Sequence, residues 1–262
     1  MFGQGCGVLH HSLEPDAYRH TRYGPPAELA RWVEHFWLEQ WDLGGRAPQA
    51  RVVLPHPCVH LVFAPGRSRC YGVQLKRFAR ELKDQGRILG IKFRPGAFYP
   101  FFHQPVSAIA NSAVPAGQVF PNAGEGERRV LACSDDLAMV AAAAAFLSEH
   151  LPADDPNVGT VCDIVEAIAG DAKITRVEQL VARFDLQERT LQRLFQRYVG
   201  ASARWVIKRY RIYDVLARLT AGEPIDWATL AQDMGYFDQS HLYNDFRKLV
   251  GCSPGQYLPS GS

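Results

Sequence analysis

The spacing of hydrophobic residues is typical of strands in the first half of the chain and of helices in the second half. Between residues 23 and 121, short aromatic and β-branched runs alternate with turns rich in Gly, Pro and Asn, which is typical of strands. The expected strands are Trp32–Trp41, Arg51–Val53, Cys58–Phe63, Arg77–Lys83 and Ile88–Phe93. The last two are expected to pair as a hairpin around residues 84–86. This spacing predicts a mostly-β barrel or sandwich, cupin-like and with a few helices.

The period changes to that of a helix at Ser134. Apolar residues recur three and four positions apart up to Leu151, and Pro152 ends the pattern. This helix is expected either to join two subunits or to pack on the β domain. Residues 152–159 form a short polar stretch. We therefore predict a β-rich domain over residues 1–151, a linker over 152–159 and a second domain over 160–262.

The second domain is predicted to be all helical. Thr175 and Glu178 have the spacing of a capping box, and Gly200, Gly222 and Gly251 follow apolar periodic stretches as helix ends. The expected helices are Val161–Ala169, Thr175–Phe184, Glu188–Val199, Ala203–Thr220, Trp227–Met234 and Asp238–Val250.

One pattern occurs twice in this domain, with an offset of 50 residues before a turn and 51 after it. Its two copies are Leu180, Asp185, Leu191, Phe195, Gly200, Ser202 and Leu230, Gly235, Leu242, Phe246, Gly251, Ser253. Each copy reads as helix, tight turn, helix, with one apolar stripe on the second helix. This predicts helix-turn-helix units near residues 175–200 and 226–251, although two ordinary packed helical hairpins would give the same pattern.

Charge favours the helix-turn-helix reading. Seven basic and no acidic residues lie between Arg189 and Arg211, and Arg189, Arg193 and Arg197 are spaced along one helix face. Arg and Gln suit bidentate contacts with guanine and adenine. From Ile212 onward there are three basic and six acidic residues. The first unit is therefore expected to supply most of the electrostatic affinity for DNA.

The C-terminal residues resemble the AraC/XylS family of bacterial transcription regulators. The resemblance covers about Val161–Leu258, and it is carried by residues 189–195, by residues 235–248 and by the closing G-x-S-P-x-x-Y pattern of residues 251–257. It implies two helix-turn-helix units joined by the long helix Ala203–Thr220, with both second helices in successive major-groove segments of double-stranded DNA. Two positions depart from the family pattern: Gln187 stands where many members have a Ser cap, and Trp227 replaces an aliphatic residue.

By position and charge, the expected DNA contacts are Arg189, Thr190, Gln192, Arg193, Arg197, Arg211, Gln239, Ser240, Tyr243, Asn244, Arg247 and Lys248. RNA polymerase is a further expected partner, and family analogy predicts a homodimer. The sequence does not decide between activator and repressor.

The β-rich half is expected to sense a ligand. The resemblance extends to an uncharacterised β-rich domain that precedes this DNA-binding module in some regulators. An aromatic-lined pocket for a small organic effector is one reading, with Trp37, Phe93, Phe98 and Phe101 as lining residues. A metal-responsive site is the alternative: if His56, Cys58 and His60 alternate along a strand they share one face, and His103 could add a fourth ligand.

Other classes of protein have little support. The sequence contains no GxSxG, Walker A, HExxH or dinucleotide-binding loop, so we expect no enzyme and no cofactor, with a hidden enzyme in the first half or an interaction module as alternatives. Six scattered cysteines without a CxxC pair indicate reduced thiols. No stretch is apolar enough to span a membrane and no signal pattern begins the chain, so a cytoplasmic protein is expected.

Overall fold

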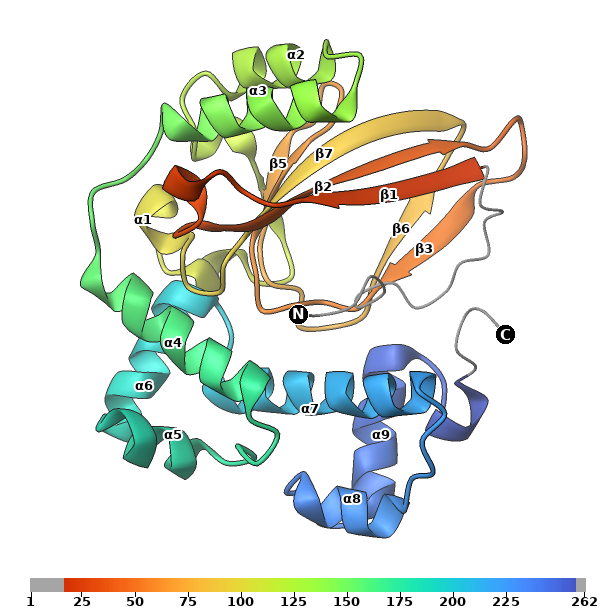
Figure 1. Ribbon diagram of the computed structural model, residues 1–262, viewed down its shortest axis with the longest axis vertical. Helices are drawn as coiled ribbons and strands as arrows, with labels where there is room; N and C mark the ends of the chain where they lie inside the picture. Colours follow the sequence, from red (N-terminus) through yellow and green to blue (C-terminus); the bar gives the residue numbers. More distant parts are fainter. Residues whose placement is uncertain (1–16, 258–262) are drawn as a thin grey trace.

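The computed structural model describes residues 17–257, which form a β-rich part followed by a helical part (Figure 1). The first part contains a six-stranded sheet in the order β1-β2-β7-β4-β5-β8, in which every neighbouring pair is antiparallel. Its strands are β1 (Tyr18–Tyr23), β2 (Val33–Asp42), β4 (His60–Phe63), β5 (Arg69–Tyr71), β7 (Gln85–Phe93) and β8 (Ala113–Pro115). The prediction of a β-rich first half and an all-helical second half is confirmed.

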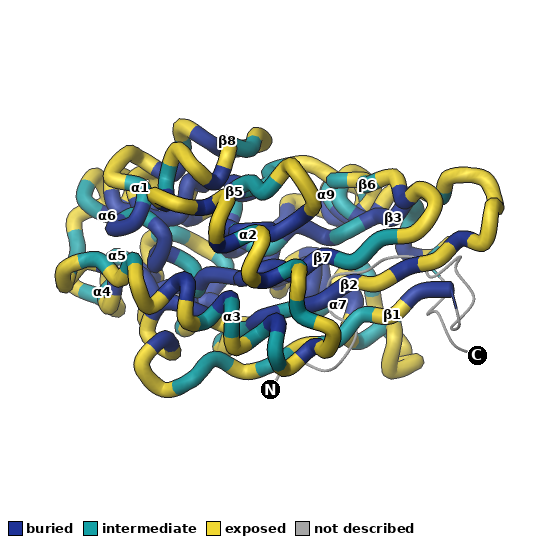
Figure 2. The backbone as a smooth tube through the Cα atoms, turned by 90° about the horizontal axis from the view of Figure 1, so that it is seen from above, coloured by how far each residue is buried: buried dark blue, intermediate teal, exposed yellow. Residues whose placement is uncertain are grey.

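Strand β7 lies inside this sheet, and both of its faces are covered over most of its length. Residues 88–93 are all buried, whereas its first three residues are not (Figure 2). Strands with both faces covered are typically nearly continuous hydrophobic runs, and the exception here is Lys92, which pairs with Glu34. The ends of the sheet were harder to predict. Strands β1, β5 and β8 are short or rich in charge, and the sequence analysis did not identify them.

The predicted hairpin over residues 78–93 is wrong. Strand β6 (Phe78–Leu82) pairs with β3 (Gln49–Val53) in a separate two-stranded ribbon. Both edges of β7 are already bonded, to β2 and β4, so β6 has no place beside it. The expected turn does form at Asp84, whose φ is 50°. It redirects the chain from the ribbon into the sheet.

Two helices cover one face of the sheet, α2 (Ala123–Leu131) and α3 (Asp136–Ser148) (Figure 1). Helix α3 begins two residues later than predicted, because Asp135 is its N-cap and accepts a hydrogen bond from the Ala138 N–H. Its buried residues include Met139, Phe146 and Leu147, which belong to the main core. Of the two predicted roles for this helix, packing on the β domain is the one observed. The remaining short helix of this part is α1 (Tyr99–Phe102).

The helical part comprises α4 (Pro156–Gly170), α5 (Val177–Phe184), α6 (Glu188–Leu194), α7 (Ala203–Thr220), α8 (Trp227–Asp233) and α9 (Gln239–Val250). Helix α4 starts five residues before the predicted Val161, inside the stretch expected to be a linker. Asp155 caps it by accepting from the Asn157 N–H, and Pro156 suits its first turn. Helix α5 is capped by Gln179, which accepts from the Thr175 and Arg176 N–H groups, rather than by the predicted Thr175–Glu178 pair.

The two parts share one hydrophobic core. Gly96 approaches α4 so closely that a Cβ there would lie 2.5 Å from Val161, and its φ of 88° also requires glycine. Nearby, Arg94 pairs with Glu166, and Asp155 accepts a hydrogen bond from the Tyr198 hydroxyl at 2.7 Å. Helix α4 is thereby joined both to the β-rich part and to the first helix-turn-helix unit. Within residues 17–257, no helix has the length and apolarity required to cross a membrane.

Candidate functional site

The second helices of both predicted units present polar faces to solvent. Leu191 and Phe195 of the first unit, and Leu242 and Phe246 of the second, are fully buried. The opposite faces are open. Arg189, Gln192 and Arg193 on α6 are exposed, as are Gln239, Ser240, Asn244, Arg247 and Lys248 on α9. The two units lie toward opposite ends of α7 (Figure 1).

Several predicted contacts are partly engaged within the protein. Thr190 is half-buried, and the Gln192 amide donates to Glu188 one turn earlier. Tyr243 is half-buried because its ring packs edge-on against Trp227, with the ring centroids 5.1 Å apart. This contact accounts for the unusual Trp at position 227.

Arg197 departs from the predicted arginine stripe. Residues Phe195–Val199 form a π-helical turn that ends at Gly200, and this wider turn changes the direction of the side chain. The Arg197 guanidinium lies over the Tyr99 ring, 4.4 Å from its centroid, and donates to the Tyr99 hydroxyl. Arg197 is exposed but is held against α1 of the β-rich part.

The structure contradicts the expectation that Arg211 contacts DNA. Arg211 is 1% exposed, and its guanidinium donates to the backbone carbonyls of Ile168, Asp171 and Ile174. Buried between the two helices, Arg211 joins the C-terminal end of α4 to α7. Arg209 is equally buried, and Lys208 pairs with Asp245 of α9. With Arg197, four of the seven basic residues between positions 189 and 211 are therefore engaged within the protein.

An exposed aromatic residue was missed by the sequence analysis. Phe237 is 89% exposed in the turn just before α9, next to the N-cap Asp238. In the sequence, Phe237 stands two residues before Gln239, the first predicted DNA contact of the second unit, and this proximity was the signal that could have identified it.

The β-rich part contains a cavity of about 360 Å³ that the sequence did not predict in this place. Its walls come from the six-stranded sheet, from the β3–β6 ribbon and from the connection between β3 and β4. Apolar lining includes Trp37, Val53, Leu54, Val62 and Phe78. Trp37 lies over Gly90, where a Cβ would approach the indole within 2.0 Å. Concave, largely apolar spaces of about 300–1,000 Å³ are typical of small-molecule sites.

Only one of the four predicted effector residues lines this cavity. Trp37 does so, but Phe93, Phe98 and Phe101 form an aromatic core cluster elsewhere, with ring centroids 5.0–6.4 Å apart. Their assignment to a pocket is wrong. Strand pairing decided which aromatic faces meet each other, and composition could not show this.

The metal-site hypothesis also fails in its geometry. Strand β4 begins only at His60, so residues 56–60 do not alternate along a strand. The His56 ring stacks on Tyr213, and His60 Nδ1 accepts a hydrogen bond from the Trp37 indole at 3.1 Å. Burial raises the pKa of the Cys58 thiol and lowers that of His60 to about 3. His103 is exposed at the end of α1. Over residues 17–257, no three His, Cys, Asp or Glu side chains gather as metal ligands.

The cavity is charged at one end. Arg51 and Arg80 face each other across the β3–β6 ribbon, and each lies 3.5 Å from a carboxylate oxygen of Glu39. Burial raises the pKa of Glu39 to about 7 and lowers that of Arg51 to about 10. Both shifts mean that the charged forms are poorly solvated there.

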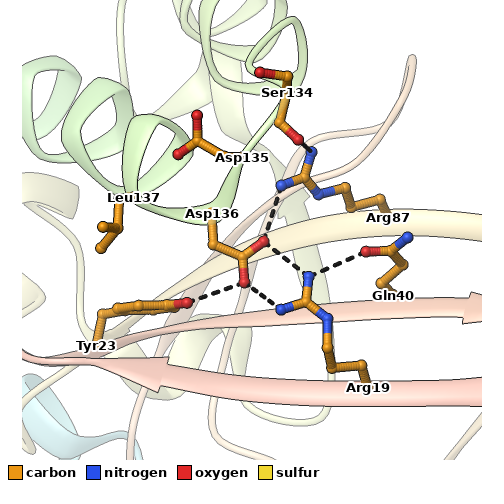
Figure 3. A pocket seen from close by; sticks show the side chains of 8 residues that line it. All are labelled: Arg19, Tyr23, Gln40, Arg87, Ser134, Asp135, Asp136 and Leu137. Carbon is orange, nitrogen blue, oxygen red and sulfur yellow. Dashed lines mark hydrogen bonds and ion pairs between the residues drawn. The ribbon is translucent and has the colours of Figure 1, made fainter. Parts of the chain in front are cut away.

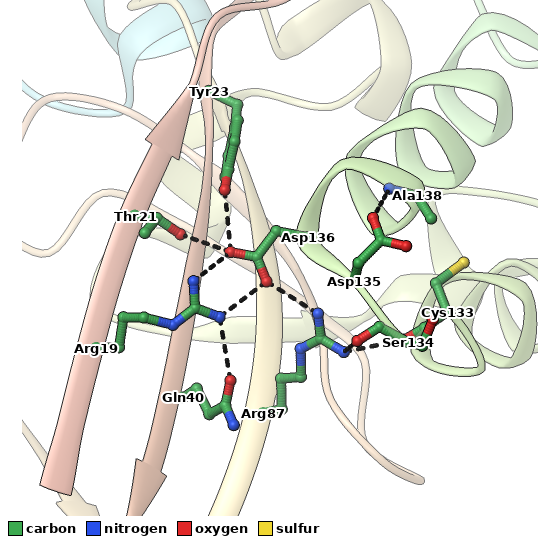
Figure 4. Close-up of polar contacts among 10 residues, drawn as sticks. All are labelled: Arg19, Thr21, Tyr23, Gln40, Arg87, Cys133, Ser134, Asp135, Asp136 and Ala138. Atoms are coloured by element: carbon green, nitrogen blue, oxygen red, sulfur yellow. Dashed lines mark hydrogen bonds and ion pairs between the residues drawn. The ribbon is translucent and has the colours of Figure 1, made fainter. Parts of the chain in front are cut away.

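A second polar cluster fastens α3 to the sheet. The Asp136 carboxylate accepts hydrogen bonds from Arg19, Arg87, Thr21 and Tyr23 (Figures 3 and 4). Arg87 also donates to the carbonyls of Cys133 and Ser134, which precede the helix. Since every acceptor site of the carboxylate is in use, we regard this cluster as structural.

Comparisons with known proteins agree with the two-part fold. Residues 180–260 match the family described as a helix-turn-helix domain, and residues 21–115 match a domain of unknown function, DUF6597. Among curated proteins, none matches the chain in sequence.

Solved structures of ToxT from Vibrio cholerae are similar in arrangement. One covers 94% of this chain and 100% of its own at 10% identity, with a TM-score of 0.43. The match to a ToxT structure bound to an unsaturated fatty acid covers 98% of this chain and 96% of that structure, at 8% identity and a TM-score of 0.39.

The fold and the domain matches define the class of protein. Its C-terminal part carries a helix-turn-helix domain of the AraC type. More particularly, the chain carries a DUF6597 domain ahead of its DNA-binding module.

Proposed function

We propose that this protein is a sequence-specific DNA-binding transcription regulator, and that a small ligand in the cavity of its β-rich domain controls its binding to DNA. The observation that carries the proposal is the position of α7. This helix links two exposed recognition faces, on α6 and α9, while its own inner side packs against the wall of the cavity. We assign the ligand function to residues 1–151 and the DNA function to residues 160–262, with residues 152–159 between them, the second half of which opens α4. RNA polymerase and a second copy of the chain are proposed as further partners.

The route from cavity to DNA runs through the connection between β3 and β4. Leu54, Pro55 and His56 line the cavity. The Tyr213 hydroxyl of α7 donates to the Pro55 carbonyl at 2.9 Å, and its ring stacks on His56 with centroids 4.6 Å apart. A ligand that moves this connection would change the contacts of α7. It would then shift the population of states in which both recognition helices are correctly placed.

DNA contact is expected first at the open part of α6. Replacing Arg193 by alanine should weaken specific binding by about 1–3 kcal/mol and relax base preference at one position, because a bidentate contact with a base would be lost. Selection of bound sequences from random duplex DNA, followed by titration of the selected site, measures both effects. Arg128→Ala is a matched control, since Arg128 is an exposed arginine on α2. An Arg193 variant with unchanged affinity and unchanged preference would contradict the assignment of α6.

Ligand control is tested by filling the cavity. Val53 lies on its wall, and Val53→Phe should occupy part of the space that a ligand needs. Small-molecule extract from bacterial cells is expected to change the DNA affinity of the wild type by about 5–150-fold, the usual range of allosteric coupling, and to leave the variant unaffected. Thermal unfolding and DNA affinity without extract verify that the variant is folded. An equal response of both proteins would exclude control through this cavity.

A further inference from the structure

The charged end of the cavity has too little negative charge for its arginines. Arg51 and Arg80 are direct partners across an antiparallel ribbon, a placement in which like charges destabilise each other. Two carboxylates line the cavity, but only that of Glu39 lies between these arginines, whereas Glu81 pairs with Lys83. Arg67 also lines this cavity and adds a further positive charge near Arg80.

Arg51 is held in place but is not satisfied. Its side chain is 4% exposed, and its guanidinium lies over the Tyr18 ring, 3.8 Å from the centroid. Among the described residues, Nη2 of Arg51 has no hydrogen-bond acceptor, and Nε, 3.5 Å from a Glu39 oxygen, forms an ion pair but no hydrogen bond. Buried donors without acceptors are costly. Arg209 is also buried without acceptors, but Arg51, unlike Arg209, lines the cavity, where an acceptor can reach it. The open donors therefore point to an acceptor that enters with a ligand.

The remainder of the cavity favours an apolar body. Trp37, Val53, Val62 and Phe78 supply its walls between the two sheets. A ligand that fits both ends carries one anionic group and an apolar portion. A guanidinium pair suits carboxylate or phosphate oxygens, because its N–H groups match their planar or tetrahedral geometry at two points.

We propose that this cavity binds an anionic amphiphile, a molecule with a carboxylate or phosphate at one end and an apolar body, and that Arg51 and Arg80 hold the anion. The proposal deepens the ligand control proposed above and rests on it only for the consequence for DNA. Binding of the anion is a property of the β-rich part and can be measured without DNA.

Glu39 competes with the ligand for the same arginines. The groups that face it are Arg51 on β3, Arg80 on β6 and His20, its cross-strand neighbour on β1. Because burial raises the pKa of Glu39 to about 7, its negative charge is lost as the pH falls below neutrality. An anion should then bind more tightly at pH 6 than at pH 8. Because His20 is the cross-strand neighbour of Glu39, a variant must show that the effect comes from Glu39.

The test uses the full chain and four probes that share a ten-carbon body. Decanoate and decyl phosphate are anionic, decanol is neutral and decylamine is cationic. Binding is followed by calorimetry and by the fluorescence of the tryptophans, which include Trp37 in the cavity wall. At least one anion is expected to bind about tenfold more tightly than decanol, and the ratio of the two anions identifies the preferred head group.

The variants locate the anion. Arg51→Gln should weaken anion binding about tenfold or more and leave decanol within twofold, while Arg128→Gln on α2 should change neither. Arg80→Gln, at a more exposed position, provides the same test if the Arg51 variant is unstable. Glu39→Gln should bind the anion at pH 8 as tightly as the wild type does at pH 6. This gain of affinity cannot arise from misfolding.

Three results would overturn the proposal: no binding of either anion, equal affinity for anion and decanol, or anion binding that is indifferent to Arg51 and Arg80. Anion binding without any effect on DNA affinity would instead refute ligand control and leave the anion site standing. If DNA affinity responds to cell extract but neither anion binds, ligand control would stand and the anion site would be refuted.

Discussion

Replacing Arg211 by alanine is expected to lower the free energy of unfolding by about 3–5 kcal/mol, the usual effect of breaking a buried charged network. Its guanidinium donates to the carbonyls of Asp171 at 2.7 Å and Ile174 at 3.3 Å, and its Nε lies 3.0 Å from a carboxylate oxygen of Asp214. Alanine would leave these acceptors buried without donors. The loss should be visible as a lower midpoint in urea, because the end of α4 and the middle of α7 would no longer be joined.

Arg218→Ala is the matched control for this prediction. Arg218 lies on the same helix and pairs with Glu223, but its side chain is 40% exposed, so its removal should cost less than about 1 kcal/mol. The rival view of Arg211 as a phosphate contact makes a different prediction. If the Arg211 variant had normal stability but bound DNA more weakly and with less dependence on salt, Arg211 would have to be a phosphate contact.

Replacing Asp136 by asparagine is expected to cost about 2–4 kcal/mol at neutral pH. Its carboxylate has a side-chain exposure of 10% and receives two guanidinium groups, from Arg19 and Arg87 (Figure 4). Removal of a charge from such a cluster leaves its partners unpaired, although the 50% exposure of the Arg19 side chain lets water compensate in part. Separation of α3 from the sheet should therefore require less denaturant.

The pH dependence gives this prediction a definite sign. Hydrogen bonds from Arg19, and then from Arg87 and Tyr23, hold the pKa of Asp136 well below its ordinary value. A carboxyl group with a depressed pKa contributes stability that is fully present above the unfolded-state value, about 3.9, and is lost as the pH falls further. The wild type and the Asn variant should thus differ most above about pH 5 and converge in acid.

Asp135→Asn is the control for Asp136. Asp135 is the exposed N-cap of the same helix, and asparagine caps a helix about as well as aspartate does. It should change the free energy of unfolding by only a few tenths of a kcal/mol. An equal effect of both substitutions would mean that the cluster around Asp136 contributes nothing beyond the helix start.

The residues that shape each helix locally were readable from the sequence. Helix α7 has the bounds that its sequence predicted, since Ser202 caps its start and Gly222 follows its end. The repeat of Leu191 and Phe195 as Leu242 and Phe246 likewise identified both buried stripes. Signals of this kind act over one or two turns of chain, so no distant partner is needed to interpret them.

The tertiary structure alone decided what the other side chains meet. Arg197, Arg209 and Arg211 belong to one basic run, yet the first contacts Tyr99 and the other two are buried. Strand β6 pairs with β3 and not with β7. This pairing places Arg51 opposite Arg80 and so forms the charged end of the cavity. The sequence by itself determined the helical repeat and hence the class of protein. The position of the cavity and the exposure of each arginine followed from the packing of residues far apart in the chain, which a local pattern does not encode.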